Sequence, residues 1–368
     1  MKSKINLTYI FSGGRKSRID LDEIYAKDFF YGYFELNKVN VNKQIVDIEH
    51  KKIIILNYLD KLIKKLLSYP ISLSSIFNTP FTNQIKNSDI IILVNESVMF
   101  FALPNLYLLK KKNKNLRTAL FTMGLFSNFS NNKYKKYLQD FFISKFCLNV
   151  IDKFLFLGKQ EYEYAVKNYP TKVSKFEYVP FGIDTHFWKN SNSYNLSERK
   201  YILFIGNDLR RDYDFVLDLA DKLHDKEFIF LTSRINKNQV SRENVKLISG
   251  MWWNNKVSDI EIKNLYSNAI VTILPLKNSL QPSGQSVALQ SMSMGTPVLI
   301  TKTDGFWDYE KFEHQKDIIF LDENNIDLWR EAIDILLARP DLLKEISNNS
   351  KKIVNRNFNL TKFSSKIE

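Results

Sequence analysis

Short runs of apolar residues alternate along this chain with longer amphipathic segments. Each run has the length of a buried strand rather than that of a helix. Such runs are typical of parallel strands covered by helices on both faces. We expect strands at residues 6–11, 90–94, 118–122, 153–157, 201–205, 227–231, 271–274, 298–301 and 318–321. The alternation predicts an α/β protein built from βα units.

The expected strands fall into two sets, separated by residues 186–200, which are rich in Asn and Ser and have the composition of a linker. A chain of 368 residues is also long enough for two hydrophobic cores. We therefore expect a first domain over residues 1–180 and a second over residues 181–358. The tail, residues 359–368, is expected to pack back on the first domain. Apolar residues at helical spacing predict core-facing closing helices at 326–337 and 341–358.

The net charge of +13 is divided unevenly between the two halves. Residues 1–180 hold 28 Lys and Arg against 15 Asp and Glu, whereas residues 181–368 hold 25 of each kind. A basic half beside a neutral half favours contact with something anionic, such as lipid headgroups, an acidic glycan or a nucleic acid. A solvated basic face without a partner is the alternative.

Cysteine and histidine content excludes several site classes. With Cys147 alone, no internal disulfide and no cysteine-based metal site is possible. The histidines His50, His186, His224 and His314 lack ligand spacing, so no metal is expected. We see no signal peptide, and polar residues interrupt the apolar stretch 90–109, which argues against a membrane span. We expect a cytoplasmic protein whose membrane contact, if any, is peripheral.

The strongest chemical signal is the continuous block of residues 265–301. A strand ending at Pro275 leads through a polar loop into a helix that begins near Ser286. The loop residues therefore lie at a helix N-terminus, where free backbone N–H groups and the helix dipole favour a phosphate. A diphosphate site is predicted here, with an ordinary helix cap as the alternative. The residues expected to hold it are Ser283, Gly284, Gln285 and Ser286.

This block resembles the donor-binding segment of glycosyltransferase family four. The family has glutamates at the positions of Pro282 and Gln290, so both carboxylates are replaced here. The resemblance implies that Gln290 accepts a hydrogen bond from the donor ribose through its amide oxygen. It also implies the GT-B fold, in which two Rossmann-like domains face a central cleft.

Further matches follow the family order. The segment 201–213 resembles the strand, glycine and basic pair that grip the donor diphosphate, which implies donor-binding roles for Gly206, Arg210 and Arg211. Guanidinium groups can hold phosphate oxygens in a bidentate manner. The resemblance also places two glycine loops near the donor, at Gly13 with Gly14 and at Gly305. Segment 121–126 lies where many members carry a histidine, and here it has none.

The resemblance implies a hexosyltransferase that uses a nucleotide diphosphate sugar and retains the anomeric configuration. Arg211, with Arg210, is expected to stabilise the departing diphosphate, and no metal or other cofactor is required. A general base, if one is used, is Glu96 at the end of strand 90–94; an exposed loop carboxylate is the alternative.

The acceptor is expected to be a glycan or a lipid-linked molecule. The apolar segment 98–109 precedes a basic run at 110–117, and Lys133–136 precede a further aromatic helix. Basic runs beside apolar faces suit an anionic membrane, although core helices with lysine-rich ends have the same pattern. We expect a role in cell-envelope polysaccharide or glycolipid synthesis.

Three alternative functions can be weighed against this one. A nucleotide-sugar epimerase of GT-B type needs histidines and carboxylates, and the scarcity of histidine disfavours it. A degenerate member that only binds nucleotide is suggested by the missing glutamates. Nucleic-acid binding is not expected, because the basic residues form no recognised module.

Overall fold

The computed structural model describes residues 4–19, 24–36, 40–48, 54–190, 195–240, 242–250 and 257–368. The chain forms two compact units. The first comprises Met1–Asp22 with Leu36–Val179, and the second comprises Glu23–Glu35 with Pro180–Glu368. The division near residue 180 lies where the sequence predicts a boundary.

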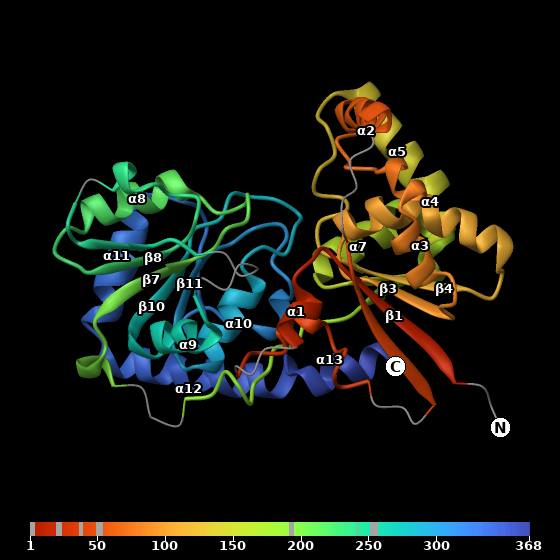
Figure 1. Cartoon of the computed structure of the whole chain (residues 1–368). Helices are drawn as coiled ribbons and strands as arrows, with labels where there is room; N and C mark the ends of the chain where they lie inside the picture. Colours follow the sequence, from red (N-terminus) through yellow and green to blue (C-terminus); the bar gives the residue numbers. More distant parts are fainter. Residues whose placement is uncertain are drawn as a thin grey trace. The chain divides into compact units, whose positions relative to one another are not determined.

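The first unit contains a six-stranded parallel sheet in the order β2-β1-β3-β4-β5-β6 (Figure 1). Its strands are β1 (Ile5–Phe11), β2 (Val41–Asp47), β3 (Ile90–Leu93), β4 (Arg117–Thr122), β5 (Lys153–Phe156) and β6 (Phe176–Tyr178). Its helices are α1 (Arg15–Ile19), α2 (Ile54–Leu67), α3 (Thr79–Ile85), α4 (Glu96–Lys112), α5 (Lys133–Phe142), α6 (Leu148–Val150) and α7 (Lys159–Asn168).

The second unit contains another six-stranded parallel sheet, in the order β12-β11-β10-β7-β8-β9. Its strands are β7 (Tyr201–Ile205), β8 (Phe228–Leu231), β9 (Val245–Ile248), β10 (Ala269–Leu274), β11 (Val298–Thr301) and β12 (Ile319–Leu321). Its helices are α8 (Tyr213–Lys222), α9 (Asp259–Asn268), α10 (Gln285–Ser293), α11 (Ile326–Leu337), α12 (Pro340–Asn357) and α13 (Leu360–Ile367). Two parallel α/β units confirm the predicted fold class.

Sequence analysis did not predict three of the strands, namely β2, β6 and β9. All three lie at or beside sheet edges, as the strand order shows. Edge strands are covered on fewer sides, so β2 has a single buried residue, Val46, and β9 has none. Strong apolar runs mark the central strands and, among the edge strands, only β12, which the sequence predicts at 318–321.

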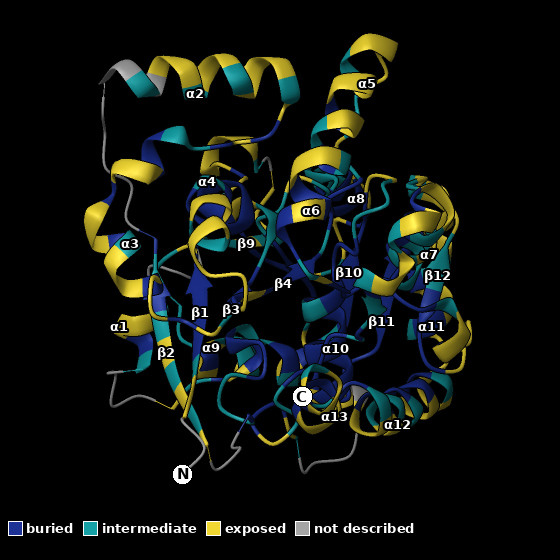
Figure 2. Ribbon diagram, turned by 90° about the vertical axis from the view of Figure 1, so that its right-hand side faces the viewer, coloured by how far each residue is buried: buried dark blue, intermediate teal, exposed yellow. Residues whose placement is uncertain are grey.

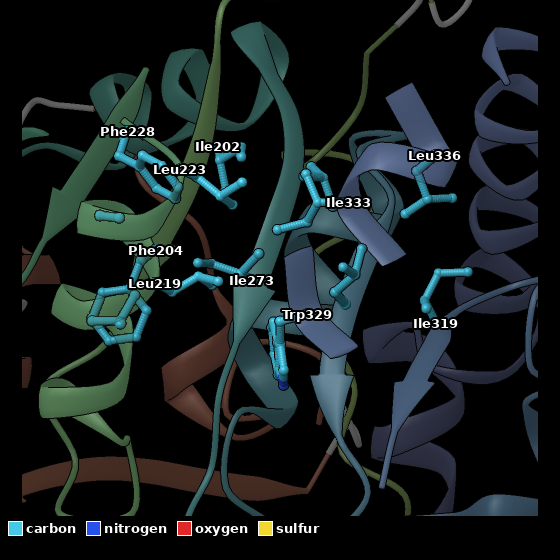
Figure 3. Packing of buried hydrophobic residues seen from close by; sticks show 14 of the residues in the cluster. Ile202, Phe204, Leu219, Leu223, Phe228, Ile273, Ile319, Trp329, Ile333 and Leu336 are labelled. Carbon is cyan, nitrogen blue, oxygen red and sulfur yellow. The ribbon is translucent and has the colours of Figure 1, made fainter. Parts of the chain in front are cut away.

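One hydrophobic core of the second unit lies between its sheet and the helices α8 and α11 (Figure 3). Trp329 on α11 is fully buried and packs edge-on against Phe215 on α8, with ring centroids 5.5 Å apart. Its indole N–H donates to the carbonyl of Glu323, so its one polar group is satisfied. The predicted closing helices are confirmed in α11 and α12, and they position the sheet that carries the site.

The segment 24–36 corrects the expected domain assignment. Residues 24–35 of it lie within the predicted first domain but belong to the second unit, where Asp28 accepts a hydrogen bond from the indole of Trp188. Trp188 itself is buried, although it falls within the predicted linker 186–200, of which residues 191–194 lie outside the described residues. A charged side chain that reaches a distant buried tryptophan leaves no local pattern in the sequence.

The tail also differs from expectation. Leu360–Ile367 form α13, and the tail 359–368 belongs to the second unit. The ring of Phe363 contacts Phe181 at 6.0 Å, and the backbone N–H of Leu360 donates to the carbonyl of Ile183. A Cβ at Gly32 would approach Ile367 to 2.9 Å, so the tail covers the segment 24–36. These apolar contacts explain why the tail is ordered here.

The apolar stretch 98–109 lies in α4, whose residues Val98 to Leu103 are buried. It therefore builds the core of the first unit, which is the alternative that the sequence left open for it. Across the described part of the chain, the search for a helix long and apolar enough to span a bilayer finds none. The same part contains no group of three or more His, Cys, Asp or Glu placed to hold a metal. His50 lies outside it.

Candidate donor-binding pocket

A pocket of about 220 Å³ lies within the second unit, beyond the carboxyl ends of β7 and β8. Parallel sheets commonly bind ligands at this edge, because the loops after the strands meet there. Its apolar wall includes Ile205, Leu231, Val257 and Ile262, and its polar wall includes Asn207, Asp208, Arg211, Asp259, Tyr266, Ser286 and Gln290. Ala26 and Phe29 from the segment 24–36 also line it.

Arg211 is the cation of this pocket. Its side chain is 2% exposed, its Nε donates to the carbonyl of Ile205, and its Nη1 lies 3.3 Å from a carboxylate oxygen of Asp208. A Cβ at Gly206 would lie 2.3 Å from Nε, so only glycine leaves room for the guanidinium. Nη1 has no hydrogen-bond partner among the described residues. A buried guanidinium N–H of this kind is suited to an anionic ligand.

The N-terminus of α10 lies beside this arginine. Gly284 is in the left-handed conformation, with φ of 80°, and a Cβ there would lie 3.2 Å from Arg211 Nη1. The first intrahelical hydrogen bond runs from Ala288 N–H to the carbonyl of Gly284, so earlier N–H groups of the helix have no acceptor within it. The hydroxyl of Ser283 is buried and has no partner among the described residues. The guanidinium of Arg211 and the N-terminus of α10 are thus adjacent.

The loop after β7 is fixed by Asn207. Its Oδ1 accepts from the hydroxyl and backbone N–H of Ser233 and from the hydroxyl of Thr232, and its amide donates to the carbonyl of Gly250. Four hydrogen bonds from one side chain hold the ends of neighbouring strands together. The wall that carries Arg211 is therefore preorganised for a ligand.

At the back of the pocket, Gln290 joins two buried polar side chains. Its Oε1 accepts from the hydroxyl of Tyr266 at 3.1 Å, and its Nε2 donates to Asp28 at 2.7 Å. Burial raises the pKa of Asp28 from its ordinary value of 3.8 to about 7, against the lowering effect of its hydrogen bonds. Sequence analysis identified Gln290 but missed Asp28 and Tyr266, although Tyr266 lies in the block that carries the resemblance.

The remaining predicted donor residues of the second unit do not line this pocket. Arg210 lies beside it, with Nε 3.4 Å from Gln281 Oε1. Gly305 packs against the loop before α10, since a Cβ there would come within 2.5 Å of the carbonyl oxygen of Gln281. Gln285 begins α10 and is buried. Structure thus brings Gly206, Arg211, Ser286 and Gln290 into the lining of one pocket, with Gly284 next to Arg211.

Gly13, Gly14 and Glu96 belong to the first unit. Both glycines have positive φ, 135° and 73°, in the turn between β1 and α1, where side chains are strained. Glu96 begins α4, and its Oε1 accepts from the backbone N–H of Met123 at 2.6 Å. It is partly buried rather than exposed, and burial raises its pKa to about 7.

A second buried carboxylate, Glu161, adjoins Glu96 and was not predicted. Its Oε1 accepts from the backbone N–H of Phe126, so the two glutamates hold the loop 123–126 after β4. Burial raises the pKa of Glu161 well above its usual value, and charge repulsion from Glu96 raises it further. This is the loop in which the resemblance led us to look for a histidine.

One protein family and several solved structures are similar to this chain. Residues 186–353 match the family model of glycosyl transferases group 1. None of the curated protein sequences compared with the chain matches it.

Several solved structures share the fold along nearly the whole chain. HepE of Anabaena in complex with UDP-glucose has a TM-score of 0.67 at 10% identity, over 99% of this chain and 98% of that one. Sucrose-phosphate synthase of Thermosynechococcus elongatus has 0.65 at 12%, and a glycosyltransferase of Rickettsia africae has 0.63 at 13%, both over 99% of this chain and 97% of theirs. The family match lies within the second unit, and together with the GT-B fold it supports a glycosyltransferase enzyme.

Proposed function

We propose that the pocket binds the nucleoside diphosphate of a nucleotide sugar, and that the enzyme transfers the sugar to a glycan or a lipid-linked acceptor. The observation that carries the proposal is the buried Arg211 guanidinium beside the N-terminus of α10. An apolar wall and a polar back next to this cation suit a nucleoside. The similar HepE structure holds UDP-glucose, which supports a uridine donor.

In this reaction the bond from the anomeric carbon to the diphosphate breaks, and negative charge develops on the leaving oxygen. Arg211, Arg210 and the first N–H groups of α10 stabilise that charge. Because these groups are fixed before the reaction, little reorganisation is needed. This donor set requires no metal and no further cofactor. We propose retention of configuration, following the resemblance to family four.

Glu96 is our candidate for the acceptor side, so we assign acceptor binding to the first unit. A carboxyl group whose pKa lies at about 7 can exchange a proton with an acceptor hydroxyl at neutral pH. Replacing Glu96 with Gln removes this capacity but keeps an acceptor for the N–H of Met123. We expect kcat to fall while donor affinity is unchanged.

The decisive experiment combines binding and turnover. Purified protein is titrated with UDP, GDP and ADP by calorimetry, and hydrolysis or transfer is followed with the matching sugar donors. Arg211→Ala should weaken nucleotide binding at least about tenfold, whereas Arg330→Ala, which removes a partly exposed arginine of α11, should not. Binding without any turnover favours the nucleotide-binding alternative, and interconversion of the donor sugar favours the epimerase. No binding of any nucleotide overturns the proposal.

We also propose peripheral contact with an anionic membrane, as part of cell-envelope polysaccharide or glycolipid synthesis at the inner face of the membrane. Much of α2 and α5 is exposed (Figure 2), and several of the exposed side chains are large and apolar. They are Tyr58, Leu59, Leu62 and Leu66 on α2 and Tyr134, Tyr137, Leu138 and Phe141 on α5. The helices are neighbours, since Gln139 Nε2 donates to the carbonyl of Leu67.

The charge of this surface, which we call the α2–α5 face, is complementary to anionic lipid. It carries Lys61, Lys64, Lys65, Lys133, Lys135, Lys136 and Lys145. Its two acidic residues are engaged, since Asp60 accepts from Leu73 N–H and Asp140 accepts from the hydroxyl of Tyr169. Lysines beside an exposed apolar stripe are typical of helices that lie in a membrane interface.

Vesicle flotation tests this contact. The protein should float with vesicles that contain about one third anionic phospholipid and stay in solution with neutral ones, because each basic residue near such a surface contributes about 1 kcal/mol. Lys64→Glu with Lys65→Glu should abolish flotation, and so should Leu62→Ser with Leu66→Ser. The matched control, Lys344→Glu with Lys352→Glu on α12, should float as the wild type does. Self-association through the face, without vesicle binding, contradicts the proposal.

A further inference from the structure

Asp28 reaches the back of the pocket from a segment far away in the sequence. Its side chain is fully buried and accepts three hydrogen bonds, from the backbone N–H of Asp184, the indole N–H of Trp188 and the amide of Gln290. The indole and the amide share one carboxylate oxygen, Oδ2, and Asp184 uses the other. Only a carboxylate offers acceptors to all three donors, because an asparagine would turn its own N–H₂ toward one of them.

The hydrogen bond at 2.7 Å decides which way the Gln290 amide points. An ionised carboxylate can only accept, so the N–H₂ of Gln290 faces Asp28 and the amide oxygen faces Tyr266. Gln290 and Tyr266 both line the pocket, so this orientation sets which donors and acceptors a ligand meets. A glutamate at position 290 would instead place a second carboxylate against the first, and the two could not both be ionised at this distance.

We propose that Asp28 is a positioning residue of the nucleotide pocket: it supplies the negative charge behind position 290 and fixes the Gln290 amide in the direction that the ligand requires. The inference rests on the proposed function, since it takes the ligand to be a nucleoside diphosphate. The effects of positions 28 and 290 on ligand binding are therefore coupled. A change at one of them alone weakens binding unless the other is changed to match.

The charges around Asp28 make this arrangement sensitive to pH. The pKa of Asp28 is raised to about 7, mainly by burial and to a lesser extent by charge repulsion from the neighbouring Asp184. On the pocket side, the group that contacts Gln290 is the hydroxyl of Tyr266. Burial raises the pKa of that hydroxyl, Arg211 opposes the rise, and Asp28 and Asp259 add to it. A protonated Asp28 has an O–H to donate, so the amide can turn around and exchange its two ends. Ligand recognition then changes near neutral pH.

A double-mutant cycle tests the coupling. Asp28→Asn, Gln290→Glu and the double variant are titrated by calorimetry with whichever of UDP, GDP and ADP binds the wild type. Each single change should weaken binding at least about tenfold, while the double variant should bind at least about fivefold better than the product of the two losses predicts. Losses that simply multiply overturn the inference.

Gln290→Glu provides a test that does not depend on how well Asp28→Asn folds. At about pH 6 the carboxyl groups at positions 28 and 290 share a proton, so the hydrogen bond between the two side chains is kept. At about pH 8 both groups are ionised and repel each other, so this hydrogen bond is lost. The affinity of this variant relative to the wild type should fall at least about fivefold between these pH values. A constant ratio contradicts the inference.

A readout without ligand separates this inference from the proposed function. The side-chain amide signals of Gln290, identified by their loss in Gln290→Glu, are followed by NMR between about pH 5.5 and pH 8.5. They should shift with a midpoint near 7 in the wild type and stay constant in Asp28→Asn. Nucleotide binding with a flat amide signal overturns the inference alone. A wild type that binds no nucleotide overturns the proposed function, and with it the role of Asp28 in nucleotide binding.

Discussion

The guanidinium of Arg211 lies directly against the backbone of Gly206, so close that a Cβ on that glycine would be 2.3 Å from Nε. The two residues are separated by the short loop that follows β7. Because the arginine is 2% exposed and its Nε is bound to the carbonyl of Ile205, it cannot move aside without losing its hydrogen bond.

Gly206→Ala should therefore displace Arg211 and weaken nucleotide binding at least about tenfold, which corresponds to 1.4 kcal/mol. Calorimetric titration with UDP measures the loss. Because a smaller side chain at position 211 removes the clash, Gly206→Ala should have little further effect in an Arg211→Ala background. Equal effects in both backgrounds contradict this explanation.

Arg211→Lys tests whether the planar fork of the guanidinium matters or only its charge. The shorter reach and single ammonium of lysine cannot reproduce two parallel hydrogen bonds to phosphate. We expect kcat/KM to fall by a factor on the order of 10². Arg210→Lys, at the edge of the same site, should have a smaller effect. Steady-state kinetics with the active donor compares the two variants, and equal effects would falsify the leading role of Arg211.

Trp329→Ala should destabilise the second unit by about 3–5 kcal/mol, since it leaves a large cavity under the sheet. Denaturant unfolding measures the change. Trp329→Phe keeps most of the apolar volume and loses only the hydrogen bond to Glu323, so it should cost clearly less. A similar loss in both variants contradicts the importance of packing at this position.

The glutamates of the first unit predict how stability depends on pH. Burial raises the pKa of Glu96 from 4.5 to about 7, and that of Glu161 is also raised, so the folded state binds more protons than the unfolded state in this range. The free energy of unfolding should therefore fall as pH rises from about 4.5 to about 7. Thermal melting across this range measures the decrease.

Glu161→Gln should remove part of this dependence. The amide oxygen can still accept from the N–H of Phe126, and the repulsion with Glu96 disappears. The variant should be more stable than the wild type at about pH 8 and similar at about pH 5. A variant that is less stable at both values shows that the carboxylate is needed for another reason.

Sequence alone determined the central strands and the closing helices, because the pattern of apolar and polar residues within a segment specifies a buried strand or an amphipathic helix. It also placed Gly206, Arg211 and the residues from Ser283 to Ser286 at the ends of strands, where parallel sheets bring loops together. The order of motifs along the chain was enough to predict the fold class and the glycosyltransferase activity.

Only the tertiary structure decided the back of the pocket and the place of the tail. Asp28 meets Gln290 across 262 positions of sequence, and neither its neighbours nor its spacing indicates such a partner. Phe363 likewise contacts Phe181, which lies 182 positions earlier in the sequence. These contacts depend on which buried donors and apolar faces remain without partners once the sheets have formed, and no local pattern of residues records that.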